Sequence, residues 1–116
     1  MDFTELLVRL NLDGRTAAIG RAADGSTWLT HDVEDGASSG VTDHRPTRQG
    51  HGDQMLFGGL LPAGAEIALV TEQVGRPVQT RSGDGAWIAL LDGGDPFTPV
   101  AACFRAADGR VVRPPL

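Results

Sequence analysis

All three histidines of the chain lie in or beside one polar stretch, residues 34–54, and they are the side chains best suited to chemistry. His44, His51 and Asp53 would supply two imidazoles and one carboxylate, a ligand set suited to zinc or another divalent transition metal. Their spacing matches no established metal motif, and a flexible loop rarely preorganises a site without the ion. The pattern therefore favours a solvated polar loop, with a metal site as the alternative.

The chain contains one cysteine, Cys103, which excludes an internal disulfide and a cysteine-based zinc cluster. A thiol acts as a nucleophile when a base such as His31 reaches it and lowers its pKa. Cys103 falls in the middle of a predicted strand, with neither a nucleophile elbow nor a helix N-terminus beside it. We therefore predict a small side chain buried in the core.

Two arginines, Arg45 and Arg48, follow His44 closely. Two guanidinium groups and an imidazole are suited to holding a phosphate or an acidic peptide. Asp43 and Asp53 lie in the same stretch, and their carboxylates would repel an anion, so the pattern favours this site only weakly.

The two tryptophans differ in their surroundings. Trp87 lies among apolar residues and is predicted to belong to the core. Trp28 shares its predicted strand face with the polar residues Ser26, Thr30 and Asp32. If it is exposed, its large amphipathic ring would anchor a protein or ligand interface.

Strands are the elements expected to position these side chains. Residues 58–112 hold most of the β-forming residues, with a turn about every 8–12 residues, as in a sandwich or small barrel. In Glu66–Glu72 the side chains of Ile67, Leu69 and Thr71 would share one face. The predicted strands of this part are Glu66–Glu72, Pro77–Arg81, Ala86–Leu91, Thr98–Ala106 and residues 111–112.

The N-terminal third is less uniform. Residues 2–12 fit a short helix through the spacing of Phe3, Leu6, Leu7 and Leu10, with a strand as the alternative. Arg15–Ala22 and Ser26–Val33 are predicted strands around the turn at residues 23–25.

Residues 34–54 hold a single large apolar residue and are predicted to form a long polar loop. Apolar character resumes at Met55–Leu61, where the pair Gly58 and Gly59 indicates a bulge or a close backbone contact. We therefore predict one all-β domain over residues 1–116, an antiparallel β-sandwich or partly open barrel with a short N-terminal helix.

One short segment nearly repeats. Arg21–Gly25 (Arg-Ala-Ala-Asp-Gly) recurs as Arg105–Gly109. This indicates either an internal duplication or, as we favour, a strand–Asp-Gly–strand hairpin that arose twice in an alanine-rich chain.

Composition limits the partners and the compartment. The formal net charge is −5 at pH 7, which argues against nucleic acid and anionic membranes as partners. The acidic N-terminus has no signal-peptide pattern, and no apolar run approaches the length of about 18 residues needed to cross a membrane. We expect a cytoplasmic protein. All ten basic residues are arginine, which with the many Ala, Gly and Asp residues indicates a GC-rich bacterial genome.

Several turn-and-strand segments resemble the immunoglobulin-like or transthyretin-like β-sandwich modules of uncharacterised actinobacterial proteins. A Gly-x-x-Pro-x-Gly turn before a strand and an Asp-Gly hairpin near the end are the shared motifs. The chain lacks the Cys–Trp–Cys core of true immunoglobulin domains. The resemblance covers about half of the chain, and it implies a fold and no catalytic residues. The segments are Phe57–Ala65, Ile67–Val70, Gly85–Ala89 and Phe104–Val112.

We expect a non-catalytic protein-interaction module of a bacterial cytoplasmic system, with no cofactor, since no established nucleotide-binding, hydrolase or metalloprotease motif occurs. One alternative is an acidic inhibitor or immunity protein, whose charge would speed association with a basic toxin. The other is a small metal-dependent enzyme that uses the loop histidines. The candidate contacts are Trp28, His44, Arg45 and Arg48, and the candidate metal ligands are His44, His51 and Asp53.

Overall fold

The structure, a computed structural model, describes residues 3–12, 15–31, 38–51, 54–93 and 98–114. In these ranges the chain forms eleven strands and no helix. All strand pairs are antiparallel, and together they make three sheets. The strands are β1 (Glu5–Leu12), β2 (Arg15–Arg21), β3 (Thr27–His31), β4 (Ser38–Val41), β5 (Thr47–His51), β6 (Gln54–Leu60), β7 (Ile67–Glu72), β8 (Val78–Ser82), β9 (Ala86–Asp92), β10 (Val100–Arg105) and β11 (Val111–Val112).

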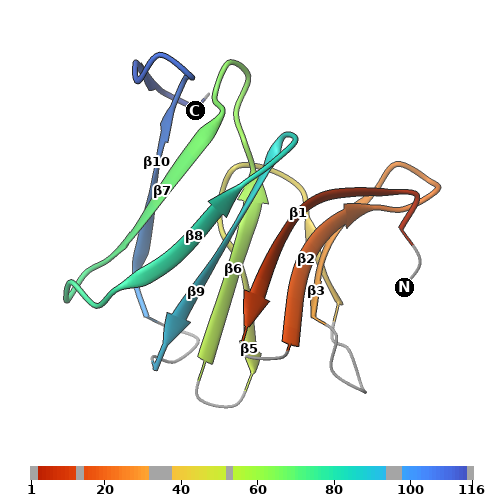
Figure 1. Ribbon diagram of the computed structural model, residues 1–116, viewed down its shortest axis with the longest axis horizontal. Coiled ribbons are helices and arrows are strands. Elements are labelled where there is room, and N and C mark those ends of the chain that lie inside the picture. The colour runs from red at the N-terminus through yellow and green to blue at the C-terminus, as the bar shows by residue number, and fades with distance from the viewer. Residues whose placement is uncertain (1–2, 13–14, 32–37, 52–53, 94–97, 115–116) are drawn as a thin grey trace.

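The first sheet has the order β1-β2-β3-β4, the middle sheet β5-β6-β9-β8 and the third sheet β11-β10-β7. The middle sheet lies between the other two (Figure 1). Strand β9 shows this directly, because Ile88 faces the first sheet, Trp87 faces the third, and both are fully buried.

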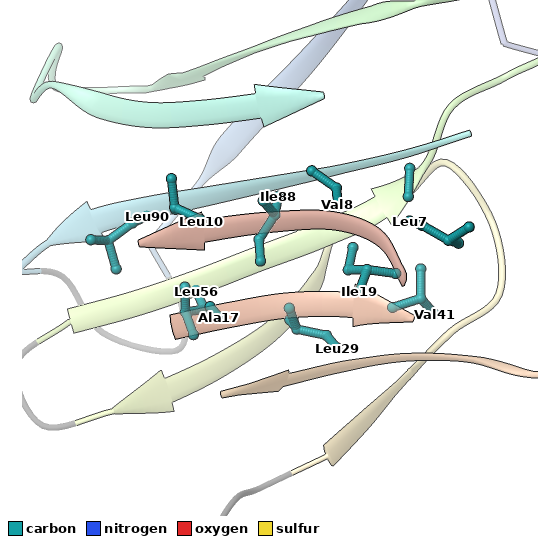
Figure 2. Close-up of a cluster of buried hydrophobic side chains, with 11 residues drawn as sticks. Leu7, Val8, Leu10, Ala17, Ile19, Leu29, Val41, Leu56, Ile88 and Leu90 are labelled. Carbon is teal, nitrogen blue, oxygen red and sulfur yellow. The ribbon is translucent and has the colours of Figure 1, made fainter. Parts of the chain in front are cut away.

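The first core fills the space between the first sheet and the middle sheet. Its side chains point toward one another from β1, β2, β3, β4, β6 and β9 (Figure 2). Period-two alternation produces most of this core, since every second residue of a regular strand faces inward; the exception is the irregular part of β1 around Leu7 and Val8. Its members are Leu7, Val8, Leu10, Ala17, Ile19, Leu29, Val41, Leu56, Ala86, Ile88 and Leu90.

The second core lies between the middle sheet and the third sheet. Strands β6 and β9 supply its large side chains, and β7 and β10 cover them with smaller ones apart from Phe104. Its members are Met55, Phe57, Ala68, Val70, Trp87, Ala89, Leu91 and Phe104.

The glycine pair of β6 makes close backbone contacts with both cores, one of the two alternatives predicted from the sequence. A Cβ on Gly58 would lie 2.8 Å from Cδ1 of Ile19, and a Cβ on Gly59 would lie 2.6 Å from Nε1 of Trp87. Each glycine therefore lets a large side chain of one core lie directly on the backbone of the middle sheet.

The predicted N-terminal helix is wrong, because residues 5–12 form β1 and pair with β2. The register shifts between Leu6 and Val8, which allows the consecutive residues Leu7 and Val8 both to be buried while Leu6 stays half exposed. This bulge hides the strand's alternation in the sequence and produces the helix-like spacing of apolar residues.

The stretch predicted as a long polar loop contains two strands. Residues 38–41 form β4 and residues 47–51 form β5, while residues 34–37 and 52–53 lie outside the described part of the chain. Each strand is the last of its sheet and pairs on one side only. Backbone hydrogen bonds form such edges without the apolar side chains on which the sequence prediction depended.

The two Arg-Ala-Ala-Asp-Gly segments form the same turn. Gly25 and Gly109 both have a φ of 88°. In each turn the carboxylate of the aspartate, Asp24 or Asp108, accepts a hydrogen bond of 3.0 Å from the backbone N–H two residues later. The interactions that form each turn lie within the turn itself, which is in keeping with a hairpin that arose twice.

We predict that Gly59→Ala lowers the free energy of unfolding by about 1–3 kcal/mol, because the new methyl group overpacks the fixed indole of Trp87. Gly40→Ala is the matched control, since it also lies in a strand and its Cβ would meet no atom within 4 Å. Urea unfolding of both variants measures the difference. Equal stability of the two would contradict the packing described for the second core.

Candidate interaction surface

The outer face of the third sheet is apolar and open. Ile67, Leu69 and Val111 are 41%, 47% and 60% exposed, and they are three of the five exposed large apolar side chains in the described ranges. Cys103 lies opposite Leu69 in the register of β7 and β10. We call the set Ile67, Leu69, Ala101, Cys103 and Val111 the apolar face.

Alternation in β7 and β10 explains why these residues point outward. Ala68 and Val70 of β7 and Phe104 of β10 belong to the second core, so their neighbours along each strand face solvent. Ile67 and Leu69 thus share a face, as their spacing predicted.

The expectation of a buried Cys103 is wrong, because its side chain is exposed. Phe104 points inward, and the register of β10 with β7 has no bulge, so the adjacent residue Cys103 points to the opposite side. His31 is buried on β3 in the first sheet, and the middle sheet separates it from β10. The structure therefore does not bring together the two residues of the possible nucleophile pair.

His44 and Arg48 lie where the second core opens to solvent. The ring of His44 meets Phe104 edge-on, with centroids 6.3 Å apart. The guanidinium of Arg48 lies 5.3 Å from the ring centroid of Phe57, and its Nη1 donates a hydrogen bond to the carbonyl of Thr98. Arg48 thus links β5 of the middle sheet to the segment just before β10, and His44, in the connection between β4 and β5, contacts the third sheet through Phe104.

Arg45 has a different environment from Arg48. Both residues are exposed, but the backbone N–H of Arg45 donates to Oδ1 of Asp43 at 2.7 Å, whereas the Arg48 side chain lies over an aromatic ring. The three residues His44, Arg45 and Arg48 are neighbours in the sequence, but the contacts of Arg48 and His44 are with aromatic rings of the core.

The predicted metal ligands His51 and Asp53 fall outside the described side chains, although the backbone of His51 ends β5. In the part of the chain that the structure describes, no three His, Cys, Asp or Glu residues lie close enough to hold a metal ion. A metal site that uses His51 and Asp53 stays a prediction.

Trp87 is fully buried, as predicted, whereas Trp28 lies half-buried on the outer face of the first sheet. The indole Nε1 of Trp28 donates to Oγ of Ser26 at 2.8 Å, and that hydroxyl donates to Oδ1 of Asp24 at 2.5 Å. The hydrogen bond from the Ser26 hydroxyl, followed by one from its backbone N–H, holds the pKa of Asp24 below its usual value. These hydrogen bonds fix the side chain of Trp28 in one orientation beside the turn.

Glu72 is a buried acid that the sequence reading did not single out. Its carboxylate accepts a hydrogen bond of 2.9 Å from Nη2 of Arg76. It also accepts hydrogen bonds of 3.0 Å from the backbone N–H groups of Val74 and Arg76. The hydrogen bond from the Arg76 side chain is the main cause that lowers the pKa of Glu72, against the effect of desolvation. The alternation of Ala68 and Val70, extended by two residues, would have placed Glu72 inside.

Comparison with known proteins finds no matching family model, curated protein or solved structure. The resemblance to immunoglobulin-like or transthyretin-like modules thus stays an expectation about fold. The described ranges also contain no helix able to cross a membrane.

We predict that Arg48→Ala destabilises the protein by about 1–2 kcal/mol, because it removes a cation–π contact and a hydrogen bond to a carbonyl. Arg45→Ala, at an exposed position nearby, should change stability by less than about 0.5 kcal/mol. Denaturant unfolding of both variants checks this difference. A result in which both behave alike would mean that Arg48 does not join the two sheets.

We predict that Glu72→Gln lowers the melting temperature near neutral pH. The folded-state pKa of Glu72 is lowered from its ordinary value of 4.5. The ionised carboxylate therefore contributes fully to the free energy of unfolding above the ordinary pKa, and this contribution is lost as the pH falls through the folded-state pKa. The difference from the wild type should therefore shrink in acid. Thermal unfolding from about pH 7 to about pH 3 measures it. Glu66→Gln, an exposed change beside the same strand, is the control, and a difference independent of pH would contradict the role of the carboxylate.

Proposed function

We propose that the chain is a non-catalytic protein-interaction module of a bacterial cytoplasmic system, built on an antiparallel β-sandwich, which binds a partner protein through the apolar face. The observation that supports this is the exposure of Ile67, Leu69 and Val111 on one three-stranded sheet. Arg105 lies between Val111 and Ile67 in the register, so the apolar residues surround one charged side chain. Exposed apolar surface of this kind marks interaction sites, because each Å² removed from water gains about 25 cal/mol.

The positive charge of Arg105 on this face indicates the charge that the partner surface should carry. Arg105 is the only charged residue at the outward positions of β7 and β10, and its Nη1 donates to the carbonyl of Gly109 at 3.2 Å. Burying a guanidinium requires an opposite charge and hydrogen bonds. The partner therefore presents an apolar surface with a carboxylate opposite Arg105. A basic partner, which the net charge alone would attract, would be repelled here.

The test compares two exposed leucines. Leu69→Ser removes the centre of the apolar face, and Leu6→Ser changes a side chain of similar exposure (50% against 47%) on β1. A protein captured by the wild-type chain is identified, purified and titrated against each variant. We expect Leu69→Ser to weaken its binding by about tenfold or more, the effect of losing about 1.4 kcal/mol, and Leu6→Ser to leave it unchanged.

Equal binding by the two variants would contradict the assignment of the face. Reversing the charge with Arg105→Glu should abolish binding, and replacing the matching partner carboxylate with arginine should restore it. If the wild-type chain alone has twice the monomer mass, and Leu69→Ser returns it to the monomer, a second copy occupies the face and a separate partner is contradicted.

A further inference from the structure

We propose that a recess beside Trp28, lined by residues of β3, of β4 and of the turn between β2 and β3 together with Leu60 of β6, binds the ring of a neutral saccharide. The recess has a volume of about 490 Å³. It lies on a different sheet from the apolar face and does not depend on it. The residues that line it include Arg21, Thr27, Trp28, Gly40, Thr42 and Leu60.

Glycines flank Trp28 on both neighbouring strands, and only one side is filled. Trp28 lies opposite Gly20 of β2 and opposite Gly40 of β4. A Cβ on Gly20 would lie 2.2 Å from the ring of Phe3, so that ring covers the first glycine. A Cβ on Gly40 would meet no atom within 4 Å. The space beside the indole is therefore open on the side of β4.

The indole is fixed before any ligand arrives. Its Nε1 is bound to the hydroxyl of Ser26, which is in turn bound to the carboxylate of Asp24. With the N–H engaged, the ring offers the recess its carbon surface rather than a donor. The negative faces of an aromatic ring attract the polarised C–H groups that line one side of a sugar ring.

The charges around the recess favour a neutral ligand. Among the residues that the structure describes, Arg21 is the only charged one lining the recess, and its Nη1 lies 3.3 Å from Oε1 and 3.4 Å from Oε2 of Glu5. An anionic ligand would have to compete with that carboxylate. A cation would find no free acid among the lining residues.

The lining combines apolar side chains, among them Trp28 and the partly buried Leu60, with the hydroxyl-bearing residues Ser26, Thr27 and Thr42. Thr27 donates its hydroxyl hydrogen to the carbonyl of Val41, so it is held at the edge of the recess by β4. The side chain of Thr42 is exposed. An apolar wall with a few polar groups at its rim is complementary to a ring that has one apolar side and hydroxyl groups around its edge.

The test uses NMR of the full chain with four neutral disaccharides, namely cellobiose, maltose, lactose and diacetylchitobiose, and with adenosine as a planar aromatic control. Trp28→Phe identifies the indole N–H signal of Trp28. We expect at least one disaccharide, at millimolar concentration, to shift that signal together with the Gly40 amide. Adenosine should not shift either signal. Trp28→Ala should abolish binding.

Gly40→Leu keeps the proposal falsifiable if Trp28→Ala does not fold, because its side chain enters open space and fills the recess. It should weaken binding by about tenfold or more, while Leu69→Ser on the third sheet should bind the sugar as the wild type does. No shift with any of the four disaccharides, or binding that survives Gly40→Leu, would overturn the proposal. Tighter binding of adenosine than of every disaccharide would also overturn it.

Discussion

The structure depends on keeping water from both sides of its middle sheet. Antiparallel sheets commonly have one face in water, but β9 is buried from Ala86 to Leu91. Such a strand is stable only between two other layers. The first and third sheets supply them, and Gly58 and Gly59 allow those layers to approach closely. The rest of the architecture follows from this requirement.

Because the central strands β6 and β9 of the middle sheet are covered on both faces, the outer faces of the other two sheets are broad surfaces left for recognition. They differ in chemistry. The third sheet presents aliphatic side chains around Leu69 and the exposed Cys103. The first sheet presents the indole of Trp28 beside the unfilled position of Gly40. An extended apolar surface suits a folded protein, whereas a recess with one fixed ring suits a small ligand.

The sequence predicts the C-terminal half of the fold well, because residues 67–112 combine clean alternation with Asp-Gly turns. It predicts β1 poorly, since the bulge at Leu7 replaces alternation with a helix-like spacing. It misses β4 and β5, whose strand character comes from backbone pairing rather than from side chains. For the candidate sites, residue type was a weaker guide than strand position. Cys103 points outward because Phe104 points inward, and Arg48 lies over Phe57 rather than facing solvent alone.

The first core joins side chains from Leu7 to Leu90, which lie far apart in the sequence. During synthesis, the strands that carry Ile19 and Leu29 therefore leave the ribosome well before β9, which completes their packing. Until then, the apolar inner faces of the early hairpins remain exposed to water. Such a topology makes folding late and cooperative, and it leaves the nascent chain dependent on protection from aggregation until its final third has emerged.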